Sequence, residues 1–222
     1  PGGAASSFNN AGVFTLNSGG NTPVSALVFN NTTSTLDIQS GNLQLNGGGS
    51  FSGVITQPGA VVNLNSGTYL ISSGTSFAST NGLLLSGSQI TNIEAALALD
   101  TLDLTGGTIN VDTLGGGTDL VINTALNWTG TATIAGGTTG GLQNLGTVNQ
   151  SGASRFFTLD QLFVDNQGSW IVDATVNNPI RLDDGTQFTN NGTFTLNSTA
   201  GISRPGGAAS SFNNAGVFTL NS

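Results

Sequence analysis

The sequence predicts an all-β fold, a parallel β-helix (β-solenoid), with about nine turns in each unit of 204 residues. Three observations predict it: an exact long repeat, a short apolar period inside that repeat, and alternation of apolar and polar residues within each short period. A right-handed coil is expected, because crossovers between parallel strands of one sheet strongly favour that hand.

The long repeat is a copied segment of eighteen residues. PGGAASSFNNAGVFTLNS occupies residues 1–18 and returns without a substitution at 205–222. Convergence does not produce an identity of that length. We therefore interpret residues 1–204 as one solenoid unit, and residues 205–222 as the start of the next identical unit, stacking on the end of the first. The chain is accordingly expected to be a piece of a longer protein.

The short period is marked by apolar-x-apolar pairs that follow turns rich in Gly, Asn and Ser. The gaps between the first residues of successive pairs run from 19 to 26 residues. Together these gaps span the distance from Phe14 to its copy, Phe218, which is one long repeat. We expect these anchors to point inward and to stack in one column, with nine whole turns in each unit and the next unit beginning in phase. The anchors are Phe14, Leu36, Val62, Leu83, Leu102, Leu126, Val148, Trp170 and Phe194.

Each turn is expected to contain two or three short strands, because the apolar period within it is two. Residues 1–26 form the first turn, and 27–74 hold two regular ones. Residues 89–100 are the least strand-like and leave a single helical turn open as an alternative. The Asn-x-Gly template then dominates 162–222. Stacking at roughly 4.8 Å per turn gives a rise of about 43 Å per unit.

Four asparagines fall at one phase of the short repeat: Asn10, Asn144, Asn166 and Asn190. Amides at a bend can bond to one another and to the backbone of adjacent turns, so a structural asparagine ladder is the preferred interpretation. The alternative is a polar row that binds sugar or metal.

Composition argues against several function classes. The net charge is −8 and lysine is absent, whereas nucleic acids and anionic membranes bind clustered cations. No apolar run reaches the roughly 20 residues needed to insert across a bilayer. Histidine and cysteine are also absent, which removes common catalytic bases, nucleophiles and metal ligands.

No catalytic, cofactor-binding or metal-binding residue is therefore assigned. Asp37 and Asp103 share one slot of the repeat but are expected to lie three turns apart, too far for a hydrolytic pair. Asp183-Asp184-Gly185 lacks the repeated acids and distal Glu of a calcium loop, so an acidic surface turn is expected there.

The Gly-, Asn-, Thr- and Ser-rich turns and strands such as Leu36-Asp-Ile38 resemble the β-helical repeats of bacterial surface proteins. Autotransporter passengers and filamentous-haemagglutinin-like adhesins are similar in pattern. The resemblance covers the whole chain and implies a secreted or surface-attached protein, acting in adhesion or matrix building. It implies no catalytic residues, and the exact long copy points to a giant tandem-repeat fibre protein.

The leading hypothesis is a structural extracellular filament or stalk whose partners are copies of the same unit, joined end to end. Phe212 is then expected to lie on Phe188, and Phe218 on Phe194. The alternative is a surface adhesin whose repeats bind glycans or host surfaces, with Tyr69 or the Phe156-Phe157 loop as a sugar platform. A polysaccharide-active enzyme is the third hypothesis.

Overall fold

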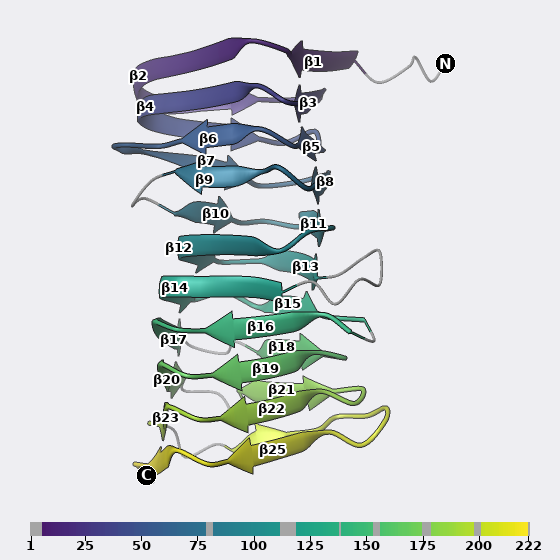
Figure 1. The fold of residues 1–222 in the computed structure, drawn as a ribbon, viewed down its shortest axis with the longest axis vertical. Coiled ribbons are helices and arrows are strands. Elements are labelled where there is room, and N and C mark those ends of the chain that lie inside the picture. Colours follow the sequence, from purple (N-terminus) through teal and green to yellow (C-terminus); the bar gives the residue numbers. More distant parts are fainter. Residues whose placement is uncertain are drawn as a thin grey trace.

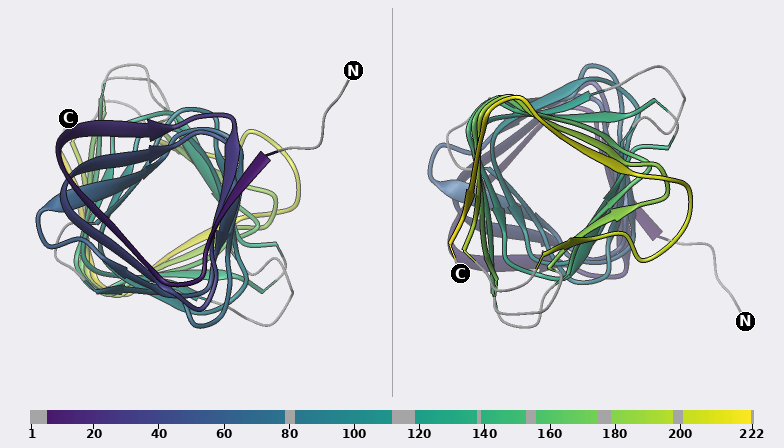
Figure 2. Two further views of the ribbon diagram at one scale, coloured as in Figure 1. Left: turned by 90° about the horizontal axis from the view of Figure 1, so that it is seen from above. Right: turned by 90° about the horizontal axis from the view of Figure 1, so that it is seen from below.

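The protein forms a coil of stacked parallel strands in a computed structural model that describes residues 6–78, 82–111, 119–137, 139–152, 156–174, 179–197 and 201–221. No helix occurs among these residues, and every strand pairing between them is parallel. The predicted β-solenoid of about nine turns is confirmed (Figure 1). Seen from above, the chain runs clockwise as it recedes, so the coil is right-handed (Figure 2).

Each turn passes through three strand-bearing faces. Face 1 is a ten-stranded sheet: β1 (Ser6–Asn10), β3 (Leu27–Asn31), β5 (Gly49–Phe51), β8 (Thr68–Ile71), β11 (Ile90–Ile93), β13 (Gly107–Val111), β15 (Ala132–Ala135), β18 (Phe157–Asp160), β21 (Ile180–Asp183) and β24 (Ile202–Ser203). Each strand of face 1 belongs to a different turn, so the described chain passes through face 1 in ten successive turns.

The other two faces belong to one sixteen-stranded sheet. Face 2 holds β6 (Val54–Thr56), β9 (Ser76–Ala78), β16 (Gly141–Asn144), β19 (Phe163–Asn166), β22 (Gln187–Asn190) and β25 (Ser211–Asn214). Face 3 holds β7 (Ala60–Leu64), β10 (Leu83–Leu85), β17 (Thr147–Gly152), β20 (Ser169–Ala174), β23 (Thr193–Leu196) and β26 (Val217–Leu220). Four long strands run through both faces: β2 (Val13–Val24), β4 (Thr35–Leu45), β12 (Leu97–Leu104) and β14 (Asp119–Trp128).

The core lies inside the coil, because alternate residues of each strand point inward and stack on their counterparts one turn away. In β12, for example, Leu102 and Leu104 are buried while Asp103 between them is only partly covered. Residues 90–93 and 97–104 are strands. The helical turn considered for residues 89–100 is therefore not formed there, and these strands follow the solenoid pattern.

The predicted single column of anchors divides between two faces. Seven of the anchors follow one another in register on face 3: Val62, Leu83, Leu102, Leu126, Val148, Trp170 and Phe194. Phe14 and Leu36 pair with each other on face 2, and Leu36 next pairs with Ile55. Val62 pairs with Leu43, not with Leu36.

The long strand β4 explains this correction. It carries Leu36 on face 2 and, seven residues later, Leu43 on face 3. The gap of 26 residues between Leu36 and Val62 is therefore one turn plus one face. Phe14 also differs in burial: it is partly buried, while the other eight anchors are fully buried.

A buried tyrosine links two turns of the core. The Tyr69 hydroxyl lies 2.7 Å from the carbonyl oxygen of Leu45 and 2.8 Å from that of Ser66, and donates to them. Burial raises the pKa of Tyr69 to about 12, although a backbone hydrogen bond from Gly48 acts in the opposite direction.

Titration of this residue is expected near pH 12 in the folded protein, against an ordinary pKa of about 10 in the unfolded chain. Between these values the folded state holds the proton more tightly, so stability falls as pH rises. Tyr69 is the single tyrosine, so tyrosinate absorbance reports it directly, and Tyr69→Phe is the blank. Titration near pH 10 with the fold intact would contradict the buried placement.

Candidate functional site

The asparagine ladder occupies the bend between faces 2 and 3. Asn144, Asn166 and Asn190 are completely buried, and each Nδ2 donates to the Oδ1 of the next asparagine at 2.6 Å, ending at Asn214. Each Nδ2 also donates to a backbone carbonyl one turn on, such as Val217 for Asn190 at 3.0 Å. The Nδ2 groups are bonded within the fold and the side chains are shielded from solvent, so these three asparagines do not form a surface row for sugar or metal.

Asn10 is not part of this ladder within the chain. It lies at the end of β1 on face 1, where its Nδ2 donates to Asn31 Oδ1 at 2.7 Å and to the carbonyl of Thr35 at 3.0 Å. The geometry of this short ladder repeats that of the longer one. The two are separated because β1 and β16 belong to different faces.

A column of glycines runs beside the ladder and explains the Asn-x-Gly template. A Cβ on Gly168 would lie 2.0 Å from the carbonyl oxygen of Gly146, and one on Gly192 would lie 2.0 Å from that of Gly168. Gly216 repeats the contact at 2.1 Å from Gly192. Glycine is required here because successive turns approach backbone to backbone. At Gly12, the first copy of Gly216, no atom lies within 4 Å.

The second copy of the repeated segment lies on the ninth turn. Phe212 stacks on Phe188 with ring centroids 4.9 Å apart, and Phe218 stacks on Phe194 at 5.4 Å. The backbone ladder continues in parallel register from β22 to β25 and from β23 to β26. Within the described residues, the junction at Arg204–Pro205 is therefore built like an interior turn.

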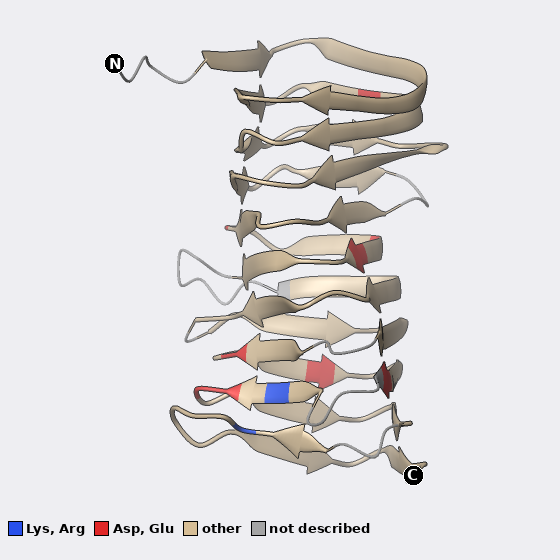
Figure 3. Cartoon of the chain, turned by 180° about the vertical axis from the view of Figure 1, so that it is seen from behind, with Lys and Arg blue, Asp and Glu red and all other residues tan. Residues whose placement is uncertain are grey.

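Three aspartates lie at the face 1 to face 2 bend near this junction. Asp160, Asp183 and Asp184 line a hollow of about 410 Å³ with Pro205, Gly206 and Gly207. The Asp184 carboxylate accepts from the backbone amide of Ala208 at 3.0 Å, which holds the junction loop. Arg204 donates to the carbonyl oxygen of Gly207 in the same loop at 2.7 Å. Figure 3 shows that the basic segments of the described chain lie toward its C-terminal end, where several acidic segments also lie.

Burial, together with the negative charges of Asp184 and Asp183, raises the pKa of Asp160. A raised folded-state pKa of an acid stabilises the protein below the unfolded-state pKa of about 4, and this contribution is lost as pH rises through the folded value. Asp160→Asn is therefore expected to raise Tm at pH 7, and this advantage should shrink below pH 4. Asp100→Asn removes the same charge three turns earlier and is the control. An advantage that grows on acidification would contradict the expectation.

No obligatory metal ion is expected at these acids. Among the described residues, no group of three or more acidic side chains is arranged to hold a metal, and calcium favours six to eight oxygen ligands. Thermal melts with excess calcium and with chelator should agree within error. A large rise of Tm with calcium that disappears in Asp184→Asn would overturn this prediction.

The acids that could have formed a catalytic pair lie on different faces. Asp37 is on the face 2 part of β4 and accepts from Thr56 at 2.8 Å. Asp103 is on the face 3 part of β12 and accepts from Asn127 at 2.8 Å. Each carboxylate is thus bonded to a neighbouring turn on its own face.

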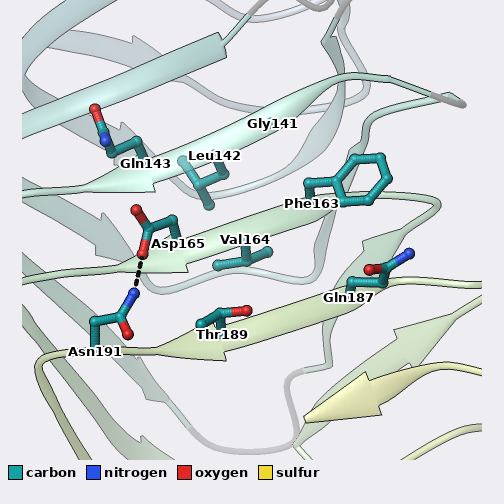
Figure 4. Close-up of a pocket in the computed structure, with 9 residues that line it drawn as sticks. All are labelled: Gly141, Leu142, Gln143, Phe163, Val164, Asp165, Gln187, Thr189 and Asn191. Atoms are coloured by element: carbon teal, nitrogen blue, oxygen red, sulfur yellow. Dashed lines mark hydrogen bonds between the residues drawn. The ribbon is translucent and has the colours of Figure 1, made fainter. Parts of the chain in front are cut away.

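A groove on the outer surface of face 2 is a candidate binding site. It has a volume of about 310 Å³ and crosses β16, β19 and β22 (Figure 4). Its outward side chains are Gln143, Phe163, Asp165, Gln187, Thr189 and Asn191. The Phe163 ring is 44% exposed. Asp165 accepts from Asn191 at 2.8 Å and from Gln167 at 2.6 Å, which fixes the carboxylate.

The sugar platforms suggested by the sequence lie elsewhere, and two of the three aromatic rings are inaccessible. Tyr69 and Phe157 are fully buried, and the guanidinium of Arg181 lies 3.6 Å over the Phe156 ring. Phe163 was missed because it precedes Val164, the residue that satisfies the inward apolar position. The sequence signal that could have identified Phe163 is an aromatic residue at an outward position of the repeat.

None of the described residues belongs to a helix long and apolar enough to cross a membrane. Comparison with known proteins gives no match to a family model, to a curated protein or to a solved structure.

Proposed function

We propose that the protein is a structural extracellular filament or stalk, built from tandem β-solenoid units that join end to end into one continuous coil. The observation that carries this proposal is the register of the second copy: Phe212 pairs with Phe188, and Phe218 with Phe194, in the parallel ladder of the interior. The proposal assigns no catalytic activity and no cofactor.

The burial of the copied apolar residues supports continuation beyond the junction. In the last turn, the inward residues Phe218 and Leu220 are 42% and 59% exposed, because they contact only the turn before them. Their first copies pair only with the turn after them; Phe14, for example, pairs with Leu36. In an array, each copied residue would contact the turn before it and the turn after it. Its side chain would then be covered by both neighbouring turns.

The low content of charged residues on the surface supports the extracellular setting in this proposal. Figure 3 shows long stretches without charge, and charged residues make up 6% of the sequence. Among the described residues, the strands pair with neighbouring turns, so few backbone groups of these strands outside the end turns are left for other chains.

Electron microscopy of chains with two and four consecutive units tests the proposal. Straight rods are expected, lengthening by about 45 Å per unit at roughly 4.8 Å per turn. This is slightly more than nine turns, because Phe8 lies on face 1 and its copy Phe212 lies on face 2. Phe8→Ser and Phe14→Ser placed in the second unit, at the positions numbered 212 and 218 here, should create a bend at the junction. The same pair in the first unit is the matched control and should leave rods straight. Beads joined by flexible hinges in the unaltered chain would overturn the filament.

A second candidate function, glycan binding by a surface adhesin, is favoured by the Phe163 groove. An exposed ring flanked by carboxylate and amide groups offers the apolar surface and the polar partners that a sugar needs. Titration calorimetry against soluble polysaccharides should give binding that Phe163→Ala abolishes. Leu145→Ala is a matched control, because Leu145 is 45% exposed but does not line the groove. Equal binding by both variants would contradict this function.

A further inference from the structure

The copied segment occupies different faces at its two positions. Phe8 in β1 pairs with Phe29 of β3 on face 1. Its copy, Phe212 in β25, pairs with Phe188 of β22 on face 2. The same sequence has therefore moved forward by one face around the coil.

The rest of the segment shows the same advance. Phe14 pairs with Leu36 on face 2, whereas its copy Phe218 pairs with Phe194 on face 3. Every turn visits faces 1, 2 and 3 in that order, and the ten strands of face 1 all precede β25. The 204-residue unit therefore comprises nine complete turns and one additional face.

We infer that, in an array of these units, each unit is turned about the fibre axis by one face, about a third of a turn, relative to the unit before it. This inference rests on the proposed tandem array. Face 2 of one unit continues as face 1 of the next, face 3 as face 2, and face 1 as face 3. Three units restore the starting orientation after about 28 turns, or roughly 135 Å.

The asparagine contacts of the two copies complement each other at such a junction. Asn214 accepts from Asn190 at 2.6 Å, while its first copy, Asn10, donates to Asn31 at 2.7 Å. In the array a single asparagine makes both bonds. The ladder that begins at Asn144 then passes from face 2 of one unit onto face 1 of the next without a break.

The aromatic contacts complement each other in the same way. Phe212 is stacked on Phe188, with centroids 4.9 Å apart and the rings 14° from parallel. Phe8 is stacked on Phe29, at 5.2 Å and 10°. One ring in the array is thus stacked on both of its faces. If the unit held nine whole turns and no additional face, Phe212 would lie on face 1 in the column of Leu159 and Leu182. Both the aromatic stacking and the amide bond from Asn190 would then be lost.

The rotation determines how the array meets a partner. A feature present once per unit, such as the Phe163 groove on face 2, recurs on three sides of the fibre in turn and not along a single line. A flat partner that lies along one side of the fibre therefore meets an equivalent groove only once in three units, about every 135 Å.

A chain of three consecutive units closed by residues 205–222 tests the inference. The sequence has no cysteine, so Thr124→Cys on the outer surface of β14 gives one thiol per unit for a gold-cluster label. Electron tomography should show straight rods with labels about 45 Å apart along the axis, each about a third of a turn from the last. Gln39→Cys, at an exposed position of β4, should give the same rotation if the first variant folds poorly.

The two possible failures look different. Straight rods whose labels lie in one line would overturn the rotation while keeping the filament. Rods that bend or separate at the junctions would overturn the filament itself, and the inference with it.

Discussion

Replacing Trp170 with alanine is expected to lower the free energy of unfolding by about 3–5 kcal/mol. The indole is completely buried, with its ring centroid 4.9 Å from that of Phe188 and 6.4 Å from that of Phe194. Its Nε1 donates to Gln150 Oε1 at 2.9 Å. Truncation leaves a large cavity between stacked turns and removes the hydrogen-bond partner of a buried amide oxygen.

Urea unfolding followed by circular dichroism measures this loss. Trp170→Phe keeps an aromatic ring in the stack and loses the indole hydrogen bond, so a smaller cost of about 1–2 kcal/mol is expected. If Trp170→Ala unfolds at the same urea concentration as the unaltered protein, the indole does not stabilise the core as described.

Replacing Gly168 with alanine is expected to cost about 3 kcal/mol or more, at the upper end of overpacking effects. Its Cβ would lie 2.0 Å from the carbonyl oxygen of Gly146, and backbone atoms of Leu145 lie within 2.9 Å. Those atoms belong to the preceding turn and cannot move aside as a flexible side chain could. The two turns would have to separate locally, weakening the ladder between β17 and β20.

Gly12→Ala is the matched control, because Gly12 occupies the same place in the Asn-x-Gly template and no atom lies within 4 Å of its Cβ position. It should leave the urea midpoint unchanged. Gly216→Ala should be harmful, since its Cβ would meet the carbonyl oxygen of Gly192 at 2.1 Å. Equal effects at 12 and 168 would show that stacking does not impose the glycine.

The sequence predicted the fold because its signal is local and repeated. Apolar residues at period two specify strands, and the short period specifies the stacking of turns. Leu83, Leu102 and Leu126 accordingly lie one above another, as the spacing predicts. The exact copy also indicated which rings lie over each other at the junction.

The division of the anchor column could not be read from spacing. A gap of 26 residues fits one long turn as well as one turn plus one face, and only the pairing of Leu36 with Ile55 separates them. Asn10 was grouped with the later asparagines because local sequence does not record which face a strand occupies. The phase of the repeat, and so the rotation between units, depends on a count of faces.

The groove on face 2 was missed for a related reason. Phe163, Asp165 and Asn191 come from two turns, and their sharing of one surface depends on the parallel register between β19 and β22. Gln150 is likewise explained by another turn, because it is a buried polar side chain at an inward position of β17. Its partner, Trp170, lies in the next turn.

The stacking of turns along one axis has a mechanical consequence. The backbone hydrogen bonds of the parallel ladders join each turn to the next along the length of the coil. A pull on the two ends therefore opens them turn by turn, as in peeling, and does not load every ladder at once in shear. One turn of about 22 residues stores roughly 75 Å of extended chain in about 5 Å of rise. If the units form the proposed filament, we expect tension to lengthen it by releasing single turns, each of which winds back onto the intact coil when the load is removed.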